Sequence, residues 1–242
     1  MIYDQLPNKT HHGWRYIKFG PDGWLYVAIG APCNVCVQQD PRFASISRIK
    51  ADGTNFQVYA KGVRNSVGFD WDPNTKQLWC TENGRDWLGD NLPPDELNHA
   101  PRQGMNFGFP YFYGNNVPDP QYGKLRSAKG MTIPVQELGP HVAALGMSFY
   151  TGKMFPKKYW NQIVIAEHGS WNRSQKIGYR LMLVTLKGNK ALSYQPFVTG
   201  WLQGQTEWGR PVDTLVMPDG ALLVSDDYAG VVYRITYRSP RL

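Results

Sequence analysis

The stretch Phe19–Gly30, FGPDGWLYVAIG, decides the fold of this chain. It places an Asp-Gly turn between two apolar runs and stops at a glycine. Asp-Gly between apolar runs is a strong hairpin signal, because glycine adopts a positive φ at no steric cost. The same phrase returns near the C-terminus as Val216–Asp227, VMPDGALLVSDD. A turn and strand repeated at opposite ends of the chain predict an internal repeat.

Two weaker copies lie between these ends, at Phe69–Glu82 and Phe155–Glu167. A second apolar strand follows three of the copies, at Ser45–Gly53, Tyr179–Gly188 and Val231–Tyr237. No stretch shows helical periodicity. Because propeller blades are four-stranded sheets of about 40–50 residues, the pattern predicts an all-β β-propeller with about four blades, in one domain over residues 1–242.

The copies are unevenly spaced, and the longest gap separates the second from the third. We expect a long loop insertion at about residues 85–145 to fill part of this gap. Six aromatic residues between Phe107 and Tyr122 argue against disorder there. Long loops in compact domains are usually functional. Residues 1–10 show no strand pattern of their own.

Composition and charge narrow the functional classes. Hydrophobic residues make up 42% of the 242 residues, which suits a folded domain. The net charge is +7, but the basic residues are scattered and no nucleic-acid motif occurs. We therefore expect no nucleic-acid partner, whereas an anionic small ligand would fit. No run approaches the roughly 18 apolar residues of a transmembrane segment, and the first residues lack an export-signal pattern.

The three cysteines are Cys33, Cys36 and Cys80. No histidine follows the CxxC of Cys33 and Cys36, which excludes haem attachment, and no second CxxC offers a zinc site. A small loop disulfide is the favoured interpretation, and a redox-active pair is the alternative. Cys80 lies mid-strand, so we expect a buried free thiol.

Short motifs along the chain are weak alone but specific in their order. They run HHGWR from His11, GVRN from Gly62, ENG from Glu82, PDELN from Pro94, GMNFGFP from Gly104, FYTG from Phe149, EHGSWNR from Glu167 and GRPVD from Gly209. This order resembles the soluble pyrroloquinoline-quinone (PQQ)-dependent sugar dehydrogenases of the L-sorbosone and soluble aldose dehydrogenase type, from His11 to Tyr237.

The resemblance implies a six-bladed propeller that binds PQQ over its central axis and uses calcium. Four recognisable blades then leave the family's N-terminal blades unmatched. It also implies oxidation of a sugar or sugar aldehyde, with electrons passing to an external acceptor. The family is typically exported, so the expected location is periplasmic or secreted. Unpaired sheet edges beside the missing blades predict oligomerisation.

By the same resemblance, His11 is the general base that takes the substrate hydroxyl proton. His12 is then structural, although a register shift of one residue would exchange the two. Arg64 stabilises negative charge on the quinone oxygen, and its alternative is a surface ion pair. Arg15 and Asn65 are expected beside the cofactor.

Gly84 and Arg85 stand where the family supplies backbone carbonyls to calcium. Proline is common at the second of these positions, and Arg85 departs from it. Asp95 and Glu96, followed by Asn98, match a segment that holds a second, structural calcium. A capped turn is the equally weighted alternative for this segment.

Three further residues match cofactor-binding positions of the family: Arg173, Arg210 and Asp213. A second arginine expected after Arg210 is replaced by Val212. His168 and Trp171 are expected to line the substrate pocket, or to pack as core side chains. Two other functions stay open: a calcium-dependent hydrolase of the lactonase type, and a non-catalytic propeller that binds a glycan or protein.

Overall fold

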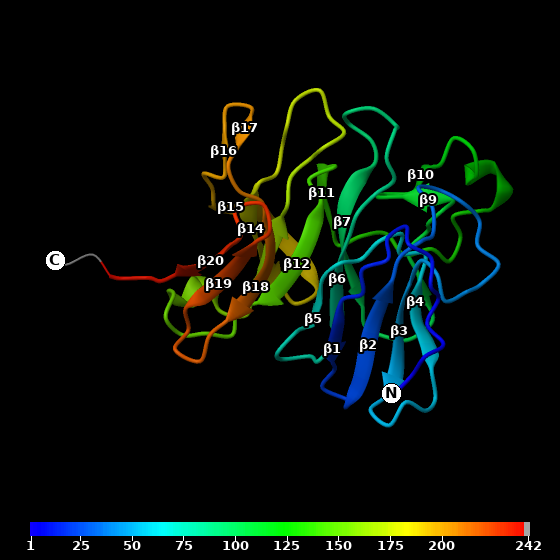
Figure 1. Ribbon diagram of the computed structural model, residues 1–242, viewed down its shortest axis with the longest axis horizontal. Coiled ribbons are helices and arrows are strands. Elements are labelled where there is room, and N and C mark those ends of the chain that lie inside the picture. Colours follow the sequence, from blue (N-terminus) through cyan, green and yellow to red (C-terminus); the bar gives the residue numbers. More distant parts are fainter. Residues whose placement is uncertain (240–242) are drawn as a thin grey trace.

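The structure is a computed structural model that describes residues 1–239, and it is all-β apart from two short 3₁₀ turns. Four sheets form its body (Figure 1). The first holds β1 (Ile17–Phe19), β2 (Trp24–Ile29), β3 (Ser45–Lys50), β4 (Gln57–Lys61) and β8 (Met105–Asn106). The second holds β5 (Phe69–Trp71), β6 (Leu78–Glu82), β7 (Pro94–Ala100) and β11 (Gln136–Pro140).

The other two sheets come from the C-terminal half of the chain. The third holds β12 (Ala144–Phe149), β13 (Ile163–Glu167), β14 (Arg180–Lys187) and β15 (Lys190–Val198). The fourth holds β18 (Pro211–Val216), β19 (Leu222–Asp226) and β20 (Val231–Ile235). Short elements complete the fold: β9 (Phe112–Tyr113), β10 (Val117–Pro118), β16 (Leu202–Gln203), β17 (Thr206–Glu207), η1 (Gly123–Leu125) and η2 (Lys157–Tyr159).

Each copy of the repeated motif supplies the second strand of a different sheet, namely β2, β6, β13 and β19. The two Asp-Gly turns share one geometry. Gly23 and Gly220 have φ of 77° and 87°, and the preceding Asp22 and Asp219 accept backbone N–H bonds from the residue after each glycine. Phe19–Gly30 and Val216–Asp227 therefore occupy equivalent strands of different sheets, and the predicted internal repeat is confirmed.

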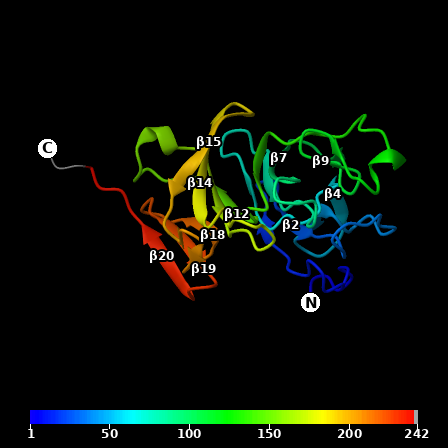
Figure 2. The same cartoon turned by 90° about the horizontal axis from the view of Figure 1, so that it is seen from above.

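The first strands of neighbouring sheets meet at the centre of the molecule. Lys18 in β1 forms an ion pair of 2.7 Å with Asp70 in β5. The other Asp70 oxygen accepts the Phe149 N–H of β12 at 2.9 Å, and Ser148 bonds Thr214 of β18 at 2.7 Å. Adjacent sheets thus contact each other through their first strands, in a propeller-like arrangement (Figure 2).

Apolar side chains fill the spaces between adjacent sheets. One cluster joins Phe69 and Leu78 to Tyr26 and Ile46, between the first and second sheets. Corresponding clusters lie between the second and third sheets and between the third and fourth, and include Trp79, Met147 and Ile165 and then Tyr150, Leu181 and Leu222. The core is thus layered between the sheets.

The region expected to be a loop at about 85–145 is only partly a loop. Its two ends form β7 and β11, which complete the second sheet. The segment PDELNHA lacks an apolar–polar alternation because nearly all of its side chains are buried, including Asp95, Glu96 and His99. Residues 101–135 remain as an insertion, anchored where Asp119 accepts from Arg85 and Tyr113.

Apolar side chains are exposed on the outermost sheets. Ile17 and Phe19 in β1 are each 57% exposed, Leu215 in β18 is 61% exposed and Val232 in β20 is 63% exposed. Among the described residues, no helix has the length and apolar character needed to cross a membrane.

Candidate functional site

A cavity of about 270 Å³ lies at one end of the sheets. Its walls come from the loop before β1, the loops after β4, β6 and β13, the start of β7 and the turn before β12. The lining residues are His11, His12, Arg64, Asn65, Asn83, Gly84, Asp86, Asp95, His141, Ala143, Trp171 and Asn172. Six residues expected at the site from sequence therefore share one cavity: His11, Arg64, Asn65, Gly84, Asp95 and Trp171.

Arg64 forms the floor of this cavity and is only 2% exposed. Its Nη1 donates to the carbonyls of Asn83 and Gly84 at 3.1 and 2.9 Å. Its Nη2 donates to Asn34 and to Asp86 at 2.9 and 3.0 Å, and its Nε donates to the Asn34 carbonyl at 2.7 Å. All five N–H donors of the guanidinium are thus paired. Arg64 offers a fixed positive charge rather than a free hydrogen bond.

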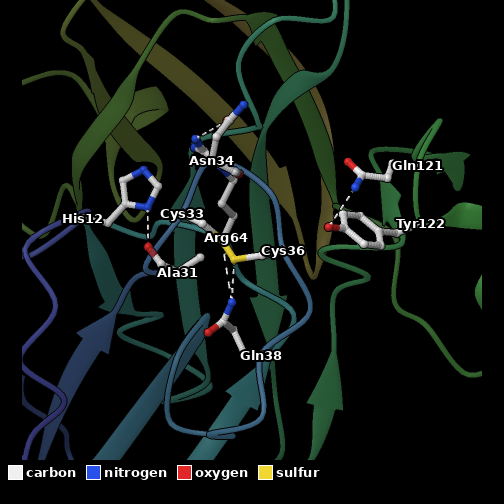
Figure 3. Close-up of a disulfide and its surroundings, with 9 residues drawn as sticks. All are labelled: His12, Ala31, Cys33, Asn34, Cys36, Gln38, Arg64, Gln121 and Tyr122. Atoms are coloured by element: carbon white, nitrogen blue, oxygen red, sulfur yellow. Dashed lines mark hydrogen bonds between the residues drawn. A yellow bond between two sulfur atoms is a disulfide. The ribbon is translucent and has the colours of Figure 1, made fainter.

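His12 is held in one orientation at the wall. Its Nδ1 lies 2.7 Å from the Ala31 carbonyl, which makes Nδ1 the donor and leaves Nε2 as an acceptor (Figure 3). Burial, with the nearby Arg64 charge, lowers its pKa to about 3. Gly30 must be glycine here, because a Cβ would lie 2.5 Å from the His12 Cβ. The glycine that ends the repeated motif therefore makes room for this histidine.

His11 lines the same cavity but is exposed. Its ring stacks edge-on against His12, with 4.1 Å between the ring centroids. His12 is thus anchored and partly buried, whereas His11 is exposed to solvent.

Buried carboxyl groups lie behind the cavity on β6 and β7. Asp95 accepts the Gly84 N–H at 2.8 Å, and burial raises its pKa to about 7. Glu96 pairs across the sheet with Glu82, and burial raises the pKa of both, to about 7 for Glu96. The side-chain oxygen of neighbouring Asn98 is buried without a hydrogen-bond partner. Among the described residues, no three His, Cys, Asp or Glu side chains converge as metal ligands.

Several expected site residues point elsewhere. Arg15 donates to the carbonyls of Pro7 and His12 and so ties down the N-terminal loop. The Arg85 side chain pairs with buried Asp119 in the insertion. Asp213 lies in β18 near the centre, where burial raises its pKa.

The remaining arginines brace loops beside the cavity. Arg173 donates to the carbonyl of Asp90. Arg210 donates to the carbonyls of His168 and Gly169 at 3.1 and 2.7 Å. His168 in turn contacts Asp227 at 2.8 Å, and its pKa is lowered by burial. Neither arginine nor His168 lines the cavity in the described structure.

The structure adds lining or supporting residues that sequence reasoning missed: Asn34, Asp86, His141 and Asn172. Asn83, a candidate ligand of the lactonase-type alternative, also lines the cavity. Asn34 lies between the two bonded cysteines of the Cys33–Cys36 disulfide, and Cys80 is buried and free, as predicted. Asp86 and Asn172 sit in the same motifs as Arg85 and Trp171. The polar character of these motifs was the available signal.

Comparison with known proteins identifies the family. The profile of the family described as "Glucose / Sorbosone dehydrogenase" matches residues 1–234. The chain is 41% identical over 245 residues to an uncharacterized protein of Borreliella burgdorferi. It is 25% identical over 263 residues to the aldose sugar dehydrogenase YliI of Escherichia coli. Each alignment covers 98% of this chain, and the chain spans 64% of the length of each relative.

Solved structures agree with this relationship. The PQQ domain of a pyranose dehydrogenase from Coprinopsis cinerea matches with a TM-score of 0.80 at 21% identity, covering 98% of this chain and 72% of that one. The PQQ-bound aldose sugar dehydrogenase of Streptomyces coelicolor matches with a TM-score of 0.63 at 26% identity, covering 92% and 57%. The chain belongs to the glucose/sorbosone dehydrogenase family.

Proposed function

We propose that this chain carries the catalytic end of a PQQ- and calcium-dependent dehydrogenase that oxidises a sugar or a sugar aldehyde. One observation carries the proposal: an oriented, neutral histidine and a buried, fully paired arginine face the same cavity. A base next to a fixed cation suits removal of a hydroxyl proton while negative charge develops nearby.

The general base is His12. The Nδ1 bond to Ala31 leaves Nε2 as the proton acceptor. The lowered pKa keeps the ring neutral, with the Nε2 lone pair free, across the ordinary pH range. The family pattern suggested His11, which lacks such an anchor and is exposed. His11 then packs against the ring of His12 and limits its movement.

Arg64 supplies charge and rigidity together. Because its donors already hold Asn34, Asn83, Gly84 and Asp86 in place, the guanidinium cannot swing toward a ligand. A preorganised charge costs no reorganisation during reaction.

The residues around Arg64 fit one end of a polar planar cofactor. The buried Asn172 Oδ1 has no partner, and Asn65 and Asn83 line the same wall. When bound, PQQ supplies the acceptor for the hydride. Arg173 and Arg210 add positive charge to this end of the molecule through the loops that they brace.

Calcium fits the oxygen-rich groups behind the cavity. Glu82 and Glu96 are buried carboxyls side by side, and neither has a cationic side chain as hydrogen-bond or ion-pair partner. A cation beside them would also satisfy the orphaned Asn98 oxygen. Oxygen atoms are the ligands that calcium prefers. The Gly84 carbonyl, expected as a ligand with that of Arg85, already accepts from Arg64, so the side-chain oxygens of Glu82, Glu96 and Asn98 are the ligands we propose.

The relatives support the proposed chemistry. The Streptomyces neighbour is PQQ-bound, and the Escherichia coli relative is an aldose sugar dehydrogenase. An oxidising compartment, periplasmic or extracellular, suits the Cys33–Cys36 disulfide. The electrons would leave through an external acceptor.

The test is reconstitution with PQQ and calcium, followed by sugar-driven reduction of an electron-accepting dye. Bound-cofactor absorbance with turnover on aldoses or sugar aldehydes supports the proposal. Lactone hydrolysis without dye reduction would replace it with a hydrolase. Absence of both quinone binding and turnover in a folded preparation would reject it for this chain.

A further inference from the structure

Two tryptophans at the mouth of the cavity are largely exposed. Trp87 is 67% exposed and Trp171 is 60% exposed. Their ring centroids lie 5.3 Å apart with the planes at 84°, so the two indoles form a corner. Trp171 also lines the cavity. Large apolar side chains left in solvent beside a cavity usually mark a binding surface.

The loops that carry this corner are rigid. Asp90 accepts from the side chains of both Arg173 and Ser174. Asp86 accepts from Asn172 at 2.8 Å, and the loop after β6 and the loop after β13 project side by side at one end of the molecule (Figure 1). The indoles are therefore exposed on a braced frame.

The backbone at Trp87 is unfavourable for its side chain. Its φ is +69°, in the left-handed region that a bulky residue rarely adopts. Because the indole stays 67% exposed, burial offsets little of this cost. Non-glycine residues in this region concentrate at ligand-binding sites, where the strain is retained for function.

The chemistry of the corner fits a sugar ring. A pyranose presents C–H groups on its faces, which pack on an indole, and hydroxyl groups around its edge, which need polar partners. A polar partner is close by, because the partly exposed Asp86 lines the cavity next to Trp87. Two indoles are a small area for a protein partner, since stable interfaces bury about 800 Å² on each side.

We infer that Trp87 and Trp171 form a platform for the second glycosyl unit of an oligosaccharide whose reacting unit occupies the cavity. This inference rests on the proposed function for the reaction itself, but the platform is a binding site in its own right. With this platform, the protein should prefer substrates of two or more sugar units.

The first test is binding without cofactor. Glucose, maltotriose and cellotriose are titrated into the protein, with tryptophan fluorescence and calorimetry as readouts. A trisaccharide should bind at least tenfold more tightly than glucose. Trp87→Ala and Trp171→Ala should each remove that advantage. Trp14→Ala is the control, because Trp14 is 90% exposed and lies outside the cavity wall.

The second test is kinetic, on the reconstituted enzyme. Trp87→Ala should raise KM for the oligosaccharide about tenfold and leave kcat, and KM for the monosaccharide, unchanged. Trisaccharide binding lost in the variants would uphold the platform even if no dye reduction is seen, which separates it from the proposed function. Equal affinity for glucose and both trisaccharides would overturn it. The inference would also be overturned if Trp87→Ala and Trp171→Ala abolished self-association of the protein and left sugar binding unchanged.

Discussion

Asn34 contacts Arg64 through two oxygens at once: its carbonyl accepts from Nε at 2.7 Å and its Oδ1 accepts from Nη2 at 2.9 Å (Figure 3). The same Oδ1 accepts the Asp86 N–H at 2.8 Å. Asn34 lies inside the four-residue disulfide loop that follows β2. The disulfide therefore helps to position the positive charge of Arg64, which comes from the loop after β4.

Reduction of the disulfide should therefore loosen the cavity floor. Removing a crosslink over such a short loop costs about 2 kcal/mol in the chain-entropy treatment, and freedom at Asn34 should weaken quinone binding as well. We expect the double variant Cys33→Ser, Cys36→Ser to unfold at lower urea concentration and to bind PQQ less tightly. Thiol titration of the unfolded, non-reduced protein should find only Cys80. A count of three thiols would contradict the prediction.

Replacing Arg64 by Lys should be severe although the charge is kept. A lysine cannot donate to Asn34, Asn83, Gly84 and Asp86 together, because its ammonium lacks the planar fork. Breaking such a buried network costs about 3–5 kcal/mol. Urea unfolding measures the loss, with exposed Arg126→Ala as the control. Stability equal to that of wild type would show that the network is not structural.

Replacing His12 by Gln should change how stability depends on pH. The folded pKa is about 3, below the ordinary value of 6.5. Between these values the unfolded chain binds more protons, so the wild type loses stability as pH falls from about 6.5 toward 3. The variant lacks this loss. Its free energy of unfolding, relative to that of the wild type, should therefore be more favourable at pH 4.5 than at pH 7.5. A variant whose stability depends on pH as that of the wild type does would contradict the prediction.

Substituting His11 and His12 one at a time shows which of them is the general base. His12→Ala should lower turnover by about 100-fold or more with PQQ still bound, as loss of a general base predicts. The acid limb of kcat/KM should lie well below pH 6.5 in the wild type. His11→Ala as the damaging variant, with His12→Ala close to wild type, would return the role to His11.

Calcium should stabilise the protein through Glu96. Burial raises the folded pKa of Glu96 to about 7, so without a cation its contribution to stability falls as pH rises from about 4.5 to 7. Calcium favours the ionised carboxylate and should raise Tm more at pH 8 than at pH 5. Glu96→Gln should abolish the difference, and a calcium effect that persists in this variant would place the ion elsewhere. Asp40→Asn, at a surface ion pair, is the control.

The exposed apolar residues of the outermost sheets should drive association. Phe19 and Leu215 are more than half exposed on β1 and β18, and burying such side chains is favourable by about 1.5–3 kcal/mol each. Sedimentation should show concentration-dependent oligomers of the wild type, and fewer with Phe19→Lys and Leu215→Lys together. A wild type that stays monomeric at all concentrations would refute this.

The sequence predicted the parts of the fold that local chemistry decides. The Asp-Gly turns at Gly23 and Gly220 are such features, and they located the second strand of two sheets. β7 was missed because Asp95, Glu96 and Asn98 have the composition of a turn, and their burial depends on packing that no local pattern encodes.

The site was predicted by motif and only partly by position. The sequence predicted that Arg64 and Gly84 lie at the same site. The hydrogen bonds of the Arg64 side chain, however, also involve Asn34 and Asp86, which lie on two different loops. No spacing in the sequence reveals such contacts. The choice between adjacent His11 and His12 likewise depended on the carbonyl of Ala31, which only the folded chain brings near.

The pairing of β8 with β4 affects how the first sheet forms during protein synthesis. β8 pairs in parallel with β4, and its residues Met105 and Asn106 follow β5, β6 and β7 in the chain. As the polypeptide leaves the ribosome, the outer edge of the first sheet therefore stays open until most of the second sheet has emerged. An open edge is a template for pairing with another nascent chain. Translational pausing between β4 and β8 should then be the point at which this protein is most vulnerable to aggregation in the cell.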